Sequence, residues 1–574
     1  MAFQKEVTKE TEKKVLLWII KKNIELITEK LAIFLVKKLK CLRRTKMFYY
    51  VKNFKMQNTL LFVFIVLWAL LNVISSLTLT WLLNALIGGK WNTFIFWALM
   101  NILCWAGYSF LQAVKDTFKE RIMQNQINKI REEILNNLIQ KPYYKVKENS
   151  KEDYNSWLIN DMTLIHDNGF SQFYGAVESV VTVLLNAFAI IYFHWLLLIV
   201  SVIMTAFVYF APQFFEKRIS KATNDVSEFS NRALGKTTDF FNGFDIFYHN
   251  NQGGYLKKQI LGSFNNLINP KVRLAKLSAT ANSVSMMASI IAQSAMFLVT
   301  GYLIMKGEVT TGVIFSIANL TSCLFNYTRG AAYNIVTLRG TFKLMDKYQQ
   351  LKDDDDVEID EAVKFKINKF NSSIETKNLV IKFENNQIIR FPNIKINKGE
   401  KIAIVGDSGT GKSTLVQLLM GDSKSYEGDI LIDRLNYRKI NIQSLQNVIS
   451  LINQSPYVFR ESLLDNLKIG REVPAELFEK TMKKSIAEEF TRNRLDMIFD
   501  DNLSGGQKAR LSIARELLGN KDILIMDEST ANLDKNTAIK IEQNILKDSN
   551  ATVIIITHHL YDESKMLLDQ IIQL

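Results

Sequence analysis

The stretch that decides the fold is GDSGTGKST, residues 406–414, which matches the phosphate-loop pattern G-x-x-x-x-G-K-[ST] at every fixed position. Before it runs KIAIV (401–405), typical of a buried strand, and after it runs TLVQLLM (414–420), with apolar residues at helical spacing. A strand, a glycine-rich turn and a helix start leave several backbone N–H groups directed at one spot, where an anion is favoured. A nucleoside triphosphate, ATP in the simplest case, is the expected ligand.

Individual residues of this loop have separate expected roles. Lys412 is expected to reach the β- and γ-phosphates, and the Ser413 hydroxyl is expected to bind Mg²⁺. A glycine-rich surface turn is the alternative reading of the loop alone. The expected phosphate-binding set is Gly406, Asp407, Ser408, Gly409, Thr410, Gly411, Lys412, Ser413 and Thr414.

A second apolar stretch, ILIMDE at 523–528, ends in two carboxylates. A buried strand that delivers an aspartate to Mg²⁺ is the usual partner of a phosphate loop, which assigns Asp527 to the metal. Glu528 follows directly and is expected to polarise the attacking water. The second motif, 115 residues after Lys412, predicts a complete α/β nucleotide site rather than an isolated loop.

Hydrophobic residues make up 48% of the 574 positions and are concentrated in the first 340. Six long segments there are nearly free of charge, and each is long enough to span a bilayer. The two longest connections between them, 115–171 and 216–277, are rich in Lys and Arg, which predicts a cytoplasmic location for both of them and for both termini. The expected spans are residues 59–87, 93–114, 172–195, 196–215, 278–305 and 309–336.

The net charge of +14 is partly local, since residues 1–60 hold 15 Lys or Arg and 5 Glu. Beside apolar segments, such a stretch favours the anionic inner leaflet of the cytoplasmic membrane over nucleic acid as its partner. Residues 13–44 alternate short apolar patches with lysines and predict an interfacial helix, or else a helix docked on the protein itself. Three scattered cysteines without a CxxC pair argue against a disulfide framework or a zinc site.

The expected domains follow from these patterns: residues 1–55 as basic amphipathic helices, 56–345 as a helical membrane domain, 346–362 as a charged linker and 363–574 as a nucleotide-binding domain. The linker contains KDDDDVEIDE at 352–361. Glu178 is the acidic residue placed to lie inside the third span, and an intramembrane carboxylate is a functional candidate. The alternative places it at the cytoplasmic interface, because its span begins a few residues earlier.

The string LSGGQ at 503–507 precedes a helical run and supplies a second helix start where anions are favoured. A phosphate loop, this string and the DE strand, in this order, resemble the ATP-binding cassette (ABC) ATPases. The resemblance implies that the ATP also contacts the signature residues Ser504, Gly505, Gly506 and Gln507.

The resemblance also implies further roles in this sequence. Phe383 matches the aromatic that stacks on adenine, and Gln454 matches the glutamine that senses Mg²⁺ and its water. Residues 531–534 match the loop that crosses a dimer interface, and His558 matches the switch histidine on the γ-phosphate. The implied catalytic residues are Glu528, His558 and Lys412, and the implied metal ligands are Ser413, Gln454 and Asp527.

The membrane half resembles the exporter type of the family, so the chain looks like a half-transporter with six spans and one cassette. Its functional unit is then expected to be a dimer, either of two copies or with another half-transporter. Residues 156–165 and 241–247 resemble regions at or near the family's first and second coupling helices. Two departures are the short segment before LSGGQ and a cassette that is short at its C-terminal end.

The expected function is ATP-driven export of an amphipathic substrate, with a peptide as the first candidate and a lipid or drug as others. No charged cluster is recognisable in the sequence, which favours an apolar or amphipathic cargo. Import of a metal–chelate complex and a ligand-sensing ATPase without transport are the alternatives. The residues expected to line the cargo cavity are Phe188, Tyr192, Met296, Phe297 and Asn319.

Overall fold

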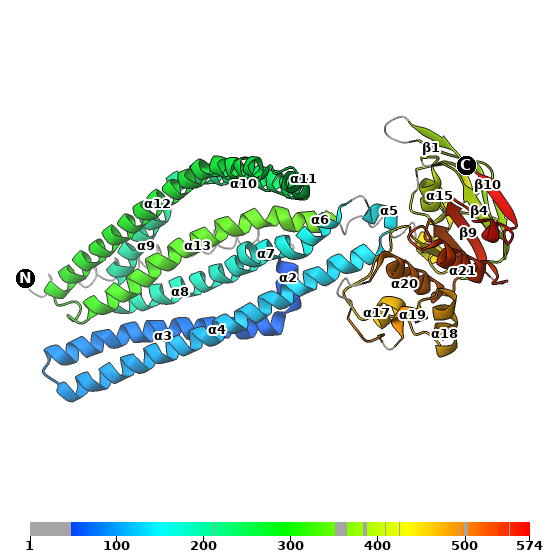
Figure 1. The fold of residues 1–574 in the computed structure, drawn as a ribbon. Helices are drawn as coiled ribbons and strands as arrows, with labels where there is room; N and C mark the ends of the chain where they lie inside the picture. Colours follow the sequence, from blue (N-terminus) through cyan, green and yellow to red (C-terminus); the bar gives the residue numbers. More distant parts are fainter. Residues whose placement is uncertain are drawn as a thin grey trace, which may run out of the picture. The chain divides into compact units, whose positions relative to one another are not determined.

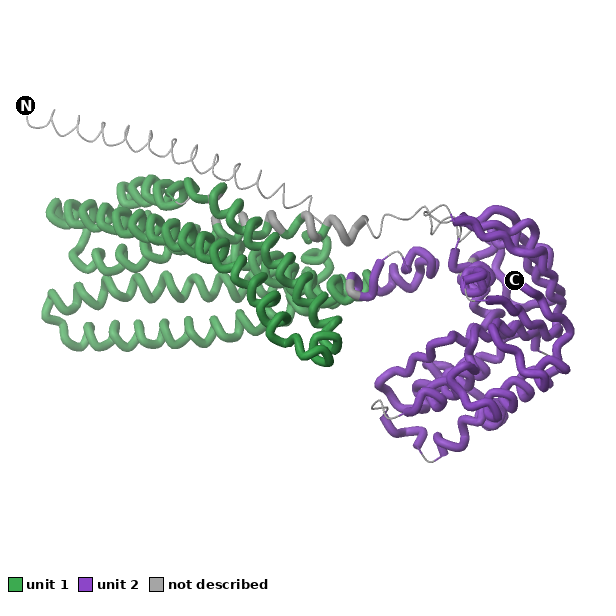
Figure 2. The backbone as a smooth tube through the Cα atoms, turned by 45° about the horizontal axis from the view of Figure 1, so that its top comes forward, with its two compact units in different colours: residues 1–134, 155–349 green, residues 135–154, 350–574 purple. Residues whose placement is uncertain are grey.

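The computed structural model describes residues 47–350 and 364–574, apart from positions 148, 212, 383–386, 408, 424, 493, 499–502 and 550. Contacts divide the chain into two units: residues 1–134 with 155–349, and residues 135–154 with 350–574 (Figure 2). The predicted interfacial helix and the acidic linker lie outside the described residues. The sequence placed 135–154 in the membrane domain, whereas their contacts group them with the cassette.

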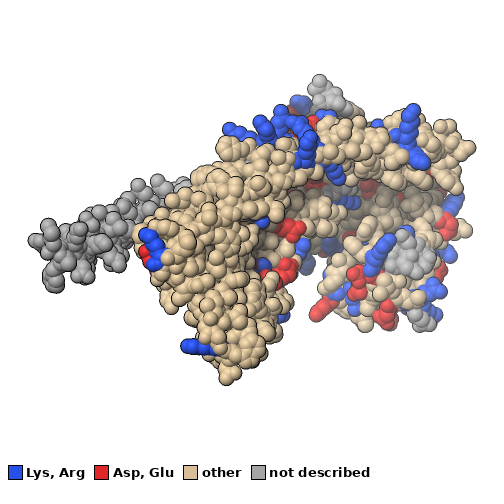
Figure 3. Space-filling view, turned by 90° about the vertical axis from the view of Figure 1, so that its left-hand side faces the viewer, with Lys and Arg blue, Asp and Glu red and all other residues tan. Residues whose placement is uncertain are grey.

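The first unit is built from long helices, and five in the described part of the chain are long and apolar enough to cross a membrane. The sixth expected span, α13, is also a long helix, but Asn319, Asn326 and Arg329 make it less apolar. Figure 3 shows a broad face with few charged side chains, as expected for helices in lipid. The helices that correspond to the six predicted spans are α3 (Lys55–Ile87), α4 (Trp91–Gln140), α8 (Ser171–Phe193), α9 (Trp195–Phe210), α12 (Gly253–Met305) and α13 (Val313–Gln350).

Two of these helices are far longer than a membrane requires. α4 has 50 residues and α12 has 53, so each extends about 75–80 Å, against about 30 Å for a hydrocarbon core. The helix α10 (Gln213–Asn242) runs beside α12, and the short α11 (Phe244–His249) joins them (Figure 1). The long charged connections are therefore continuations of the membrane helices, as the sequence predicts.

The unit packs around a cluster drawn from five of its helices, including Val73, Ile190, Leu197, Ala292 and Phe325, each at most 8% exposed. Polar contacts join α3 to α13 near the turns that end them. The Thr80 and Ser316 hydroxyls contact each other, and the side-chain oxygen Oδ1 of Asn84 accepts a 2.9 Å hydrogen bond from the Gly312 N–H. Residues between α4 and α8 form short helices: α5 (Tyr143–Val146), α6 (Lys151–Asn155), a π-helix (Ser156–Asp161), α7 (Met162–Ile165) and a second π-helix (His166–Phe170).

The second unit contains two sheets. One is antiparallel, with strand order β2-β1-β5-β6 and β3 paired to β1; the other is parallel, with order β10-β4-β9-β8-β7. The strands are β1 (Ser373–Lys382), β2 (Ile388–Arg390), β3 (Lys395–Asn397), β4 (Lys401–Val405), β5 (Glu427–Ile432), β6 (Leu435–Asn436), β7 (Ile449–Ile452), β8 (Ile523–Asp527), β9 (Thr552–Thr557) and β10 (Gln570–Gln573).

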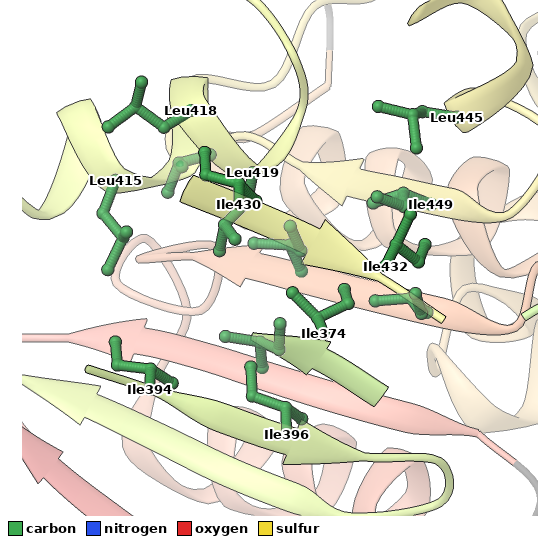
Figure 4. Packing of buried hydrophobic residues seen from close by; sticks show 14 of the residues in the cluster. Ile374, Ile394, Ile396, Leu415, Leu418, Leu419, Ile430, Ile432, Leu445 and Ile449 are labelled. Atoms are coloured by element: carbon green, nitrogen blue, oxygen red, sulfur yellow. The ribbon is translucent and has the colours of Figure 1, made fainter. Parts of the chain in front are cut away.

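The helices of this unit include α15 (Lys412–Leu419), which follows β4. A main hydrophobic cluster joins strands of both sheets to this helix, with Ile374, Ile396 and Ile430 meeting Leu415 and Leu419 (Figure 4). The three inner strands of the parallel sheet, β4, β9 and β8, are largely apolar, as expected for strands covered on both faces. The other helices are α16 (Ile442–Leu445), α17 (Leu463–Lys468), α18 (Ala475–Lys484), α19 (Glu488–Thr491), α20 (Gly505–Leu517), α21 (Lys535–Leu546) and α22 (Asp562–Lys565).

Candidate nucleotide site

The phosphate loop connects β4 to α15, as the sequence predicts. Gly409 and Gly411 have φ values of +89° and +99°, which side-chain-bearing residues rarely adopt. At Gly406, a Cβ would lie 2.9 Å from both the Leu574 carbonyl oxygen and the Thr410 hydroxyl. The glycines are therefore required by the backbone path that brings the start of α15 to the end of β4.

Lys412 is 7% exposed, and its ammonium is held against the loop. Its Nζ donates to the carbonyl oxygens of Gly406 at 2.6 Å and Asp407 at 2.8 Å. These bonds fix a positive charge at the helix start, where the dipole of α15 also favours an anion. The arrangement fits the phosphates of ATP.

The remaining site residues lie at the carboxyl ends of neighbouring parallel strands. Asp527 ends β8, Glu528 follows it, and His558 follows β9. Glu528 has a φ of +46°, uncommon for a residue with a side chain, and its N–H donates to Ile556 O at 2.9 Å. A strained backbone that is held in place by a neighbouring strand indicates that the orientation of the Glu528 side chain is important for function.

The Glu528 carboxylate is held between two side chains. Gln454 Nε2 donates to Glu528 Oε2 at 2.7 Å, and His558 Nδ1 lies 3.2 Å from Glu528 Oε1. Glu528 is 18% exposed and His558 59%, so the histidine lies on the open side of the carboxylate. This geometry suits a carboxylate that orients a water and accepts its proton, with the histidine close to where the γ-phosphate would lie.

Asp527 is half-buried beside Glu528, and burial together with this second carboxylate raises its pKa, although Lys412 partly opposes the effect. A half-buried carboxylate beside a second one provides a site that a divalent cation would stabilise. Asp527 and Ser413 would hold Mg²⁺, which neutralises phosphate charge when bound. In the described part of the chain, no group of three or more His, Cys, Asp or Glu side chains could hold a metal unaided, which agrees with an ion that relies on ATP oxygens.

The signature residues form the start of α20. Ser504 caps the helix: its hydroxyl accepts from Gln507 N–H at 3.2 Å, and the Gln507 side chain accepts from Ser504 N–H at 2.9 Å. A Cβ at Gly506 would lie 3.6 Å from the Asn532 carbonyl oxygen, and Asn532 Nδ2 is 3.5 Å from Gln454 O. The residues 531–534 therefore connect the signature helix with the glutamine that holds Glu528.

The structure brings together Lys412, Asp527, Glu528, Gln454 and His558 as the sequence predicts. Within the described part of the cassette, no hydrogen bond or ion pair joins the signature residues 504–507 to the phosphate loop. Phe383 and Ser408 lie outside the described residues.

The residues expected around the cargo differ in their exposure within this unit. Met296 is buried in the helical core at 1% exposure, whereas Phe188 and Tyr192 are exposed by 76% and 73%. A single pattern of aromatic residues along helices did not distinguish core positions from surface positions.

Sequence reasoning missed residues that support the site. Arg515 of α20 donates to Tyr457 O at 2.8 Å and to Asn466 O at 2.7 Å, tying the signature helix to the segment after Gln454. Gln443 donates to the carbonyl oxygens of Ile139 at 3.2 Å and Gln140 at 2.6 Å, the end of α4. Neither contact can be predicted from the sequence, because the hydrogen-bond acceptors are backbone oxygens far away along the chain.

The segment expected to resemble the first coupling helix, residues 156–165, groups with the membrane helices. Residues 135–154 are the part of this connection that groups with the cassette.

Comparisons with known proteins agree with this arrangement. Residues 390–531 match the model of the ABC transporter family, and residues 59–328 match that of the ABC transporter transmembrane region. An uncharacterized ABC transporter ATP-binding protein, YwjA of Bacillus subtilis, is 27% identical, covering 89% of this chain and 91% of its own length. An ATP-dependent lipid A-core flippase of Wigglesworthia glossinidia brevipalpis is 27% identical over 66% of this chain and 67% of its own.

A putative multidrug export ATP-binding/permease protein, YgaD of Bacillus subtilis, is 25% identical over 63% of this chain and 64% of its own. Among solved structures, a bacterial Atm1-family ABC exporter with ATP bound gives a TM-score of 0.73 at 18% identity, covering 89% of this chain and 92% of that one. Because the helices and the cassette are each matched by a model of the same family, the chain belongs to the ABC transporters, with the fold of an exporter-type half-transporter and an ATP-hydrolysing cassette.

Proposed function

We propose that this protein is an ATP-driven exporter of an amphipathic substrate across the cytoplasmic membrane, working as a dimer by alternating access. The observation that carries the proposal is the carboxylate of Glu528, held between Gln454 and His558 in a cassette fused to long membrane helices. The carboxylate supplies hydrolysis, and the helices extend far enough from the membrane to transmit movement. The cassette and both termini are cytoplasmic in this proposal, since the connections rich in Lys and Arg lie on that side.

Conversion of hydrolysis into movement requires that ATP binds one conformation better than another. ATP on Lys412 and the start of α15 favours the closed pair of cassettes, and its hydrolysis at Glu528 removes that preference. The contact of Gln443 with the end of α4 is one route by which the cassette reaches the membrane helices. Gln443 precedes β7, which leads directly to Gln454.

A dimer of two copies is proposed because the start of α20 favours an anion, whereas no hydrogen bond or ion pair in the described part of the cassette joins residues 504–507 to the phosphate loop. A partner's phosphate loop would complete the ATP site, and the same arrangement would exist twice. A surface of aromatic side chains at α11 supports the same conclusion: Phe241, Phe244 and Tyr248 stack on one another and are 41–72% exposed. Exposed aromatic clusters of this kind mark protein contacts.

The cargo is proposed to be an amphipathic peptide first, with a lipid or a drug as the other candidates. Two of the relatives are named as a lipid A-core flippase and a putative multidrug export protein, which supports an amphipathic cargo in general. Uptake of a metal–chelate complex and a ligand-sensing ATPase are alternative functions on the same fold.

The test compares the spent medium and the cell extract of the native host carrying either the wild-type protein or the Glu528→Gln variant, by untargeted mass spectrometry. A compound that disappears from the medium and accumulates in the cells would support export and identify the cargo. Accumulation in the medium instead would show uptake. With no difference in either fraction, ligand-stimulated ATPase activity without flux in sealed vesicles would replace transport by a sensing role.

A further inference from the structure

A group of four charged side chains, two of them largely buried, lies between α4 and α8. Lys115 Nζ is 3.1 Å from Glu178 Oε2 and 3.4 Å from Asp116 Oδ1, and Lys119 Nζ is 3.0 Å from Glu178 Oε1 and 3.2 Å from Asp116 Oδ1. The side chains of Lys115 and Glu178 are only 2% and 12% exposed. The sequence did not reveal this charged cluster, because Glu178 is 63 positions from Lys115.

Aromatic rings surround the same ammonium. Lys115 Nζ lies 3.8 Å from the centroid of the Trp68 ring on α3. Tyr108 of α4 stacks on Trp68 at 5.0 Å, and Tyr327 of α13 meets it edge-on at 6.1 Å. A cation over an indole face, flanked by carboxylates, is the geometry by which proteins bind organic ammonium groups.

Buried polar atoms without partners continue from this group along the helices. Trp68 Nε1 has no partner among the described residues, and neither has Asn72 Oδ1, one turn further along α3. On α8, Thr182 Oγ1 and Asn186 Oδ1 are likewise unpaired, one and two turns beyond Glu178. Unpaired atoms in a helical core cost free energy, so their retention points to a ligand or to a second conformation.

The depth of the group suits a cargo that enters from the cytoplasm. Trp68 lies 19 residues before the end of α3, or about 28 Å along the helix. The hydrocarbon core is about 30 Å thick, so the group lies at its border, on the side away from the α3–α4 turn. Charged side chains at this depth are uncommon and generally functional.

We propose that Trp68, Glu178 and Asp116 form a binding site for the ammonium group of the cargo, and that Lys115 occupies this site until the cargo replaces it. The inference rests on the proposed export function and adds that the cargo is a cationic amphiphile, such as a peptide with a free amine. The aromatic face and the carboxylates both attract a cation. The unpaired amide oxygens of Asn72 and Asn186 accept hydrogen bonds, which an ammonium or a peptide N–H can donate.

Substitution of Lys115 tests the proposal, because a cation site and an anion site predict opposite changes in binding. Lys115→Met removes the internal competitor and leaves Lys119 to pair with Glu178, so it should strengthen the binding of an amine. If the lysines instead bind an anionic cargo, the same substitution should weaken the binding of a carboxylate. Trp68→Leu should weaken amine binding about tenfold, since it removes the cation–π contact.

The measurement is equilibrium binding of tritiated dodecylamine to the full-length protein in nanodiscs, without nucleotide, with unlabelled dodecylamine, N-dodecylacetamide and dodecanoate as competitors. The amine should bind at least tenfold more tightly than the neutral amide of similar chain length, and Lys115→Met should increase this difference. Lys129→Met is the matched control, because Lys129 lies on α4 but is exposed and pairs with Glu132 at 2.9 Å. Trp68→Phe, which retains an aromatic face, should lie between Trp68→Leu and the wild type.

Weaker dodecanoate binding in Lys115→Met, with unchanged amine binding, would overturn the proposal in favour of an anion site. If every variant binds the amine and the amide equally, and the variants melt at lower temperatures than the wild type, the four charged side chains only stabilise the contact between the helices. Either result with ATP-driven flux intact contradicts only the cargo inference. Selective amine binding in a protein that drives no flux contradicts only the proposed export.

Discussion

We propose that ATP hydrolysis depends on the carboxylate of Glu528. Its contacts with Gln454 and His558 fix both oxygens in a direction that an amide side chain could keep without being able to accept a proton. We expect Glu528→Gln to bind ATP normally and to reduce turnover at least about 100-fold. Phosphate release and nucleotide binding measure the two effects separately.

Glu563→Gln is a control for this substitution, because Glu563 is an exposed acidic residue at the start of α22. It should leave turnover unchanged. Normal turnover in Glu528→Gln would contradict a catalytic role of this carboxylate, and His558 would then be the next candidate.

Asp527 affects the stability of the protein through the raised pKa of its carboxyl group. Its pKa is raised by burial and by Glu528, so ionisation costs stability in the nucleotide-free protein above the raised pKa. This cost disappears as the pH falls below the ordinary carboxyl value, where the group is protonated in both the folded and the unfolded state. Asp527→Asn should therefore raise the melting temperature at pH 7.5, and the gain should shrink at acidic pH.

With Mg²⁺ and ATP added, the wild type should have a higher melting temperature than Asp527→Asn, because the wild-type carboxylate then binds the ion and the amide does not. Thermal unfolding across pH, with and without Mg²⁺–ATP, tests both parts. A melting temperature that falls in nucleotide-free Asp527→Asn at pH 7.5 would contradict the assigned direction of the pKa shift.

At the scale of elements, the end of α4 is the part of the membrane helices with a defined contact in the cassette unit. The last carbonyl groups of a helix lack partners within it, and Pro142 prevents α4 from continuing. Gln443 supplies the missing donor to Ile139 and Gln140. We expect Gln443→Ala to speed hydrogen exchange in residues 135–147 about fivefold, since roughly 1 kcal/mol of hydrogen bonding is lost.

Gln446→Ala is the matched control, because Gln446 is exposed and lies just after α16. If Gln443 also transmits movement, cargo should stimulate ATP hydrolysis less in Gln443→Ala while hydrolysis without cargo stays the same. Identical exchange in the two variants would show that the side-chain contact does not hold α4.

How far the sequence predicts elements depends on the range of the interactions. The phosphate loop, the signature helix and the DE strand each depend on a short contiguous stretch of sequence, and each was predicted with its residues. The spans were predicted within a few residues at the ends near the turns, such as Ile87 and Met305. The antiparallel sheet and the pairing of Lys115 with Glu178 were not, because they join segments far apart whose separate patterns resemble ordinary strands and helices.

At the scale of the whole molecule, the composite ATP sites of a dimer give a strong test of the proposed assembly. Lys412→Ala disables the phosphate loop, and Gly506→Asp places a negative charge at the signature helix. A Cβ at Gly506 meets its neighbours at no less than 3.6 Å, so the second variant should fold. Each variant alone should be inactive, because every site in either dimer carries one defect.

A mixed dimer of the two variants differs, because one of its sites combines both defects and the other combines the intact phosphate loop of one copy with the intact signature of the other. Random mixing makes about half of the dimers mixed, and each mixed dimer has one of two sites intact. Mixed dimers purified through both tags should therefore have about half of the wild-type ATPase activity if the sites act independently. Co-expression of both variants with different affinity tags, followed by tandem purification and a phosphate-release assay, measures this. Inactive mixed dimers, with the two variants still co-purifying, would mean that both sites must work together or that the natural partner is a different half-transporter. The ATPase activity of the purified wild-type homodimer separates these two cases, since only the first predicts that it is active.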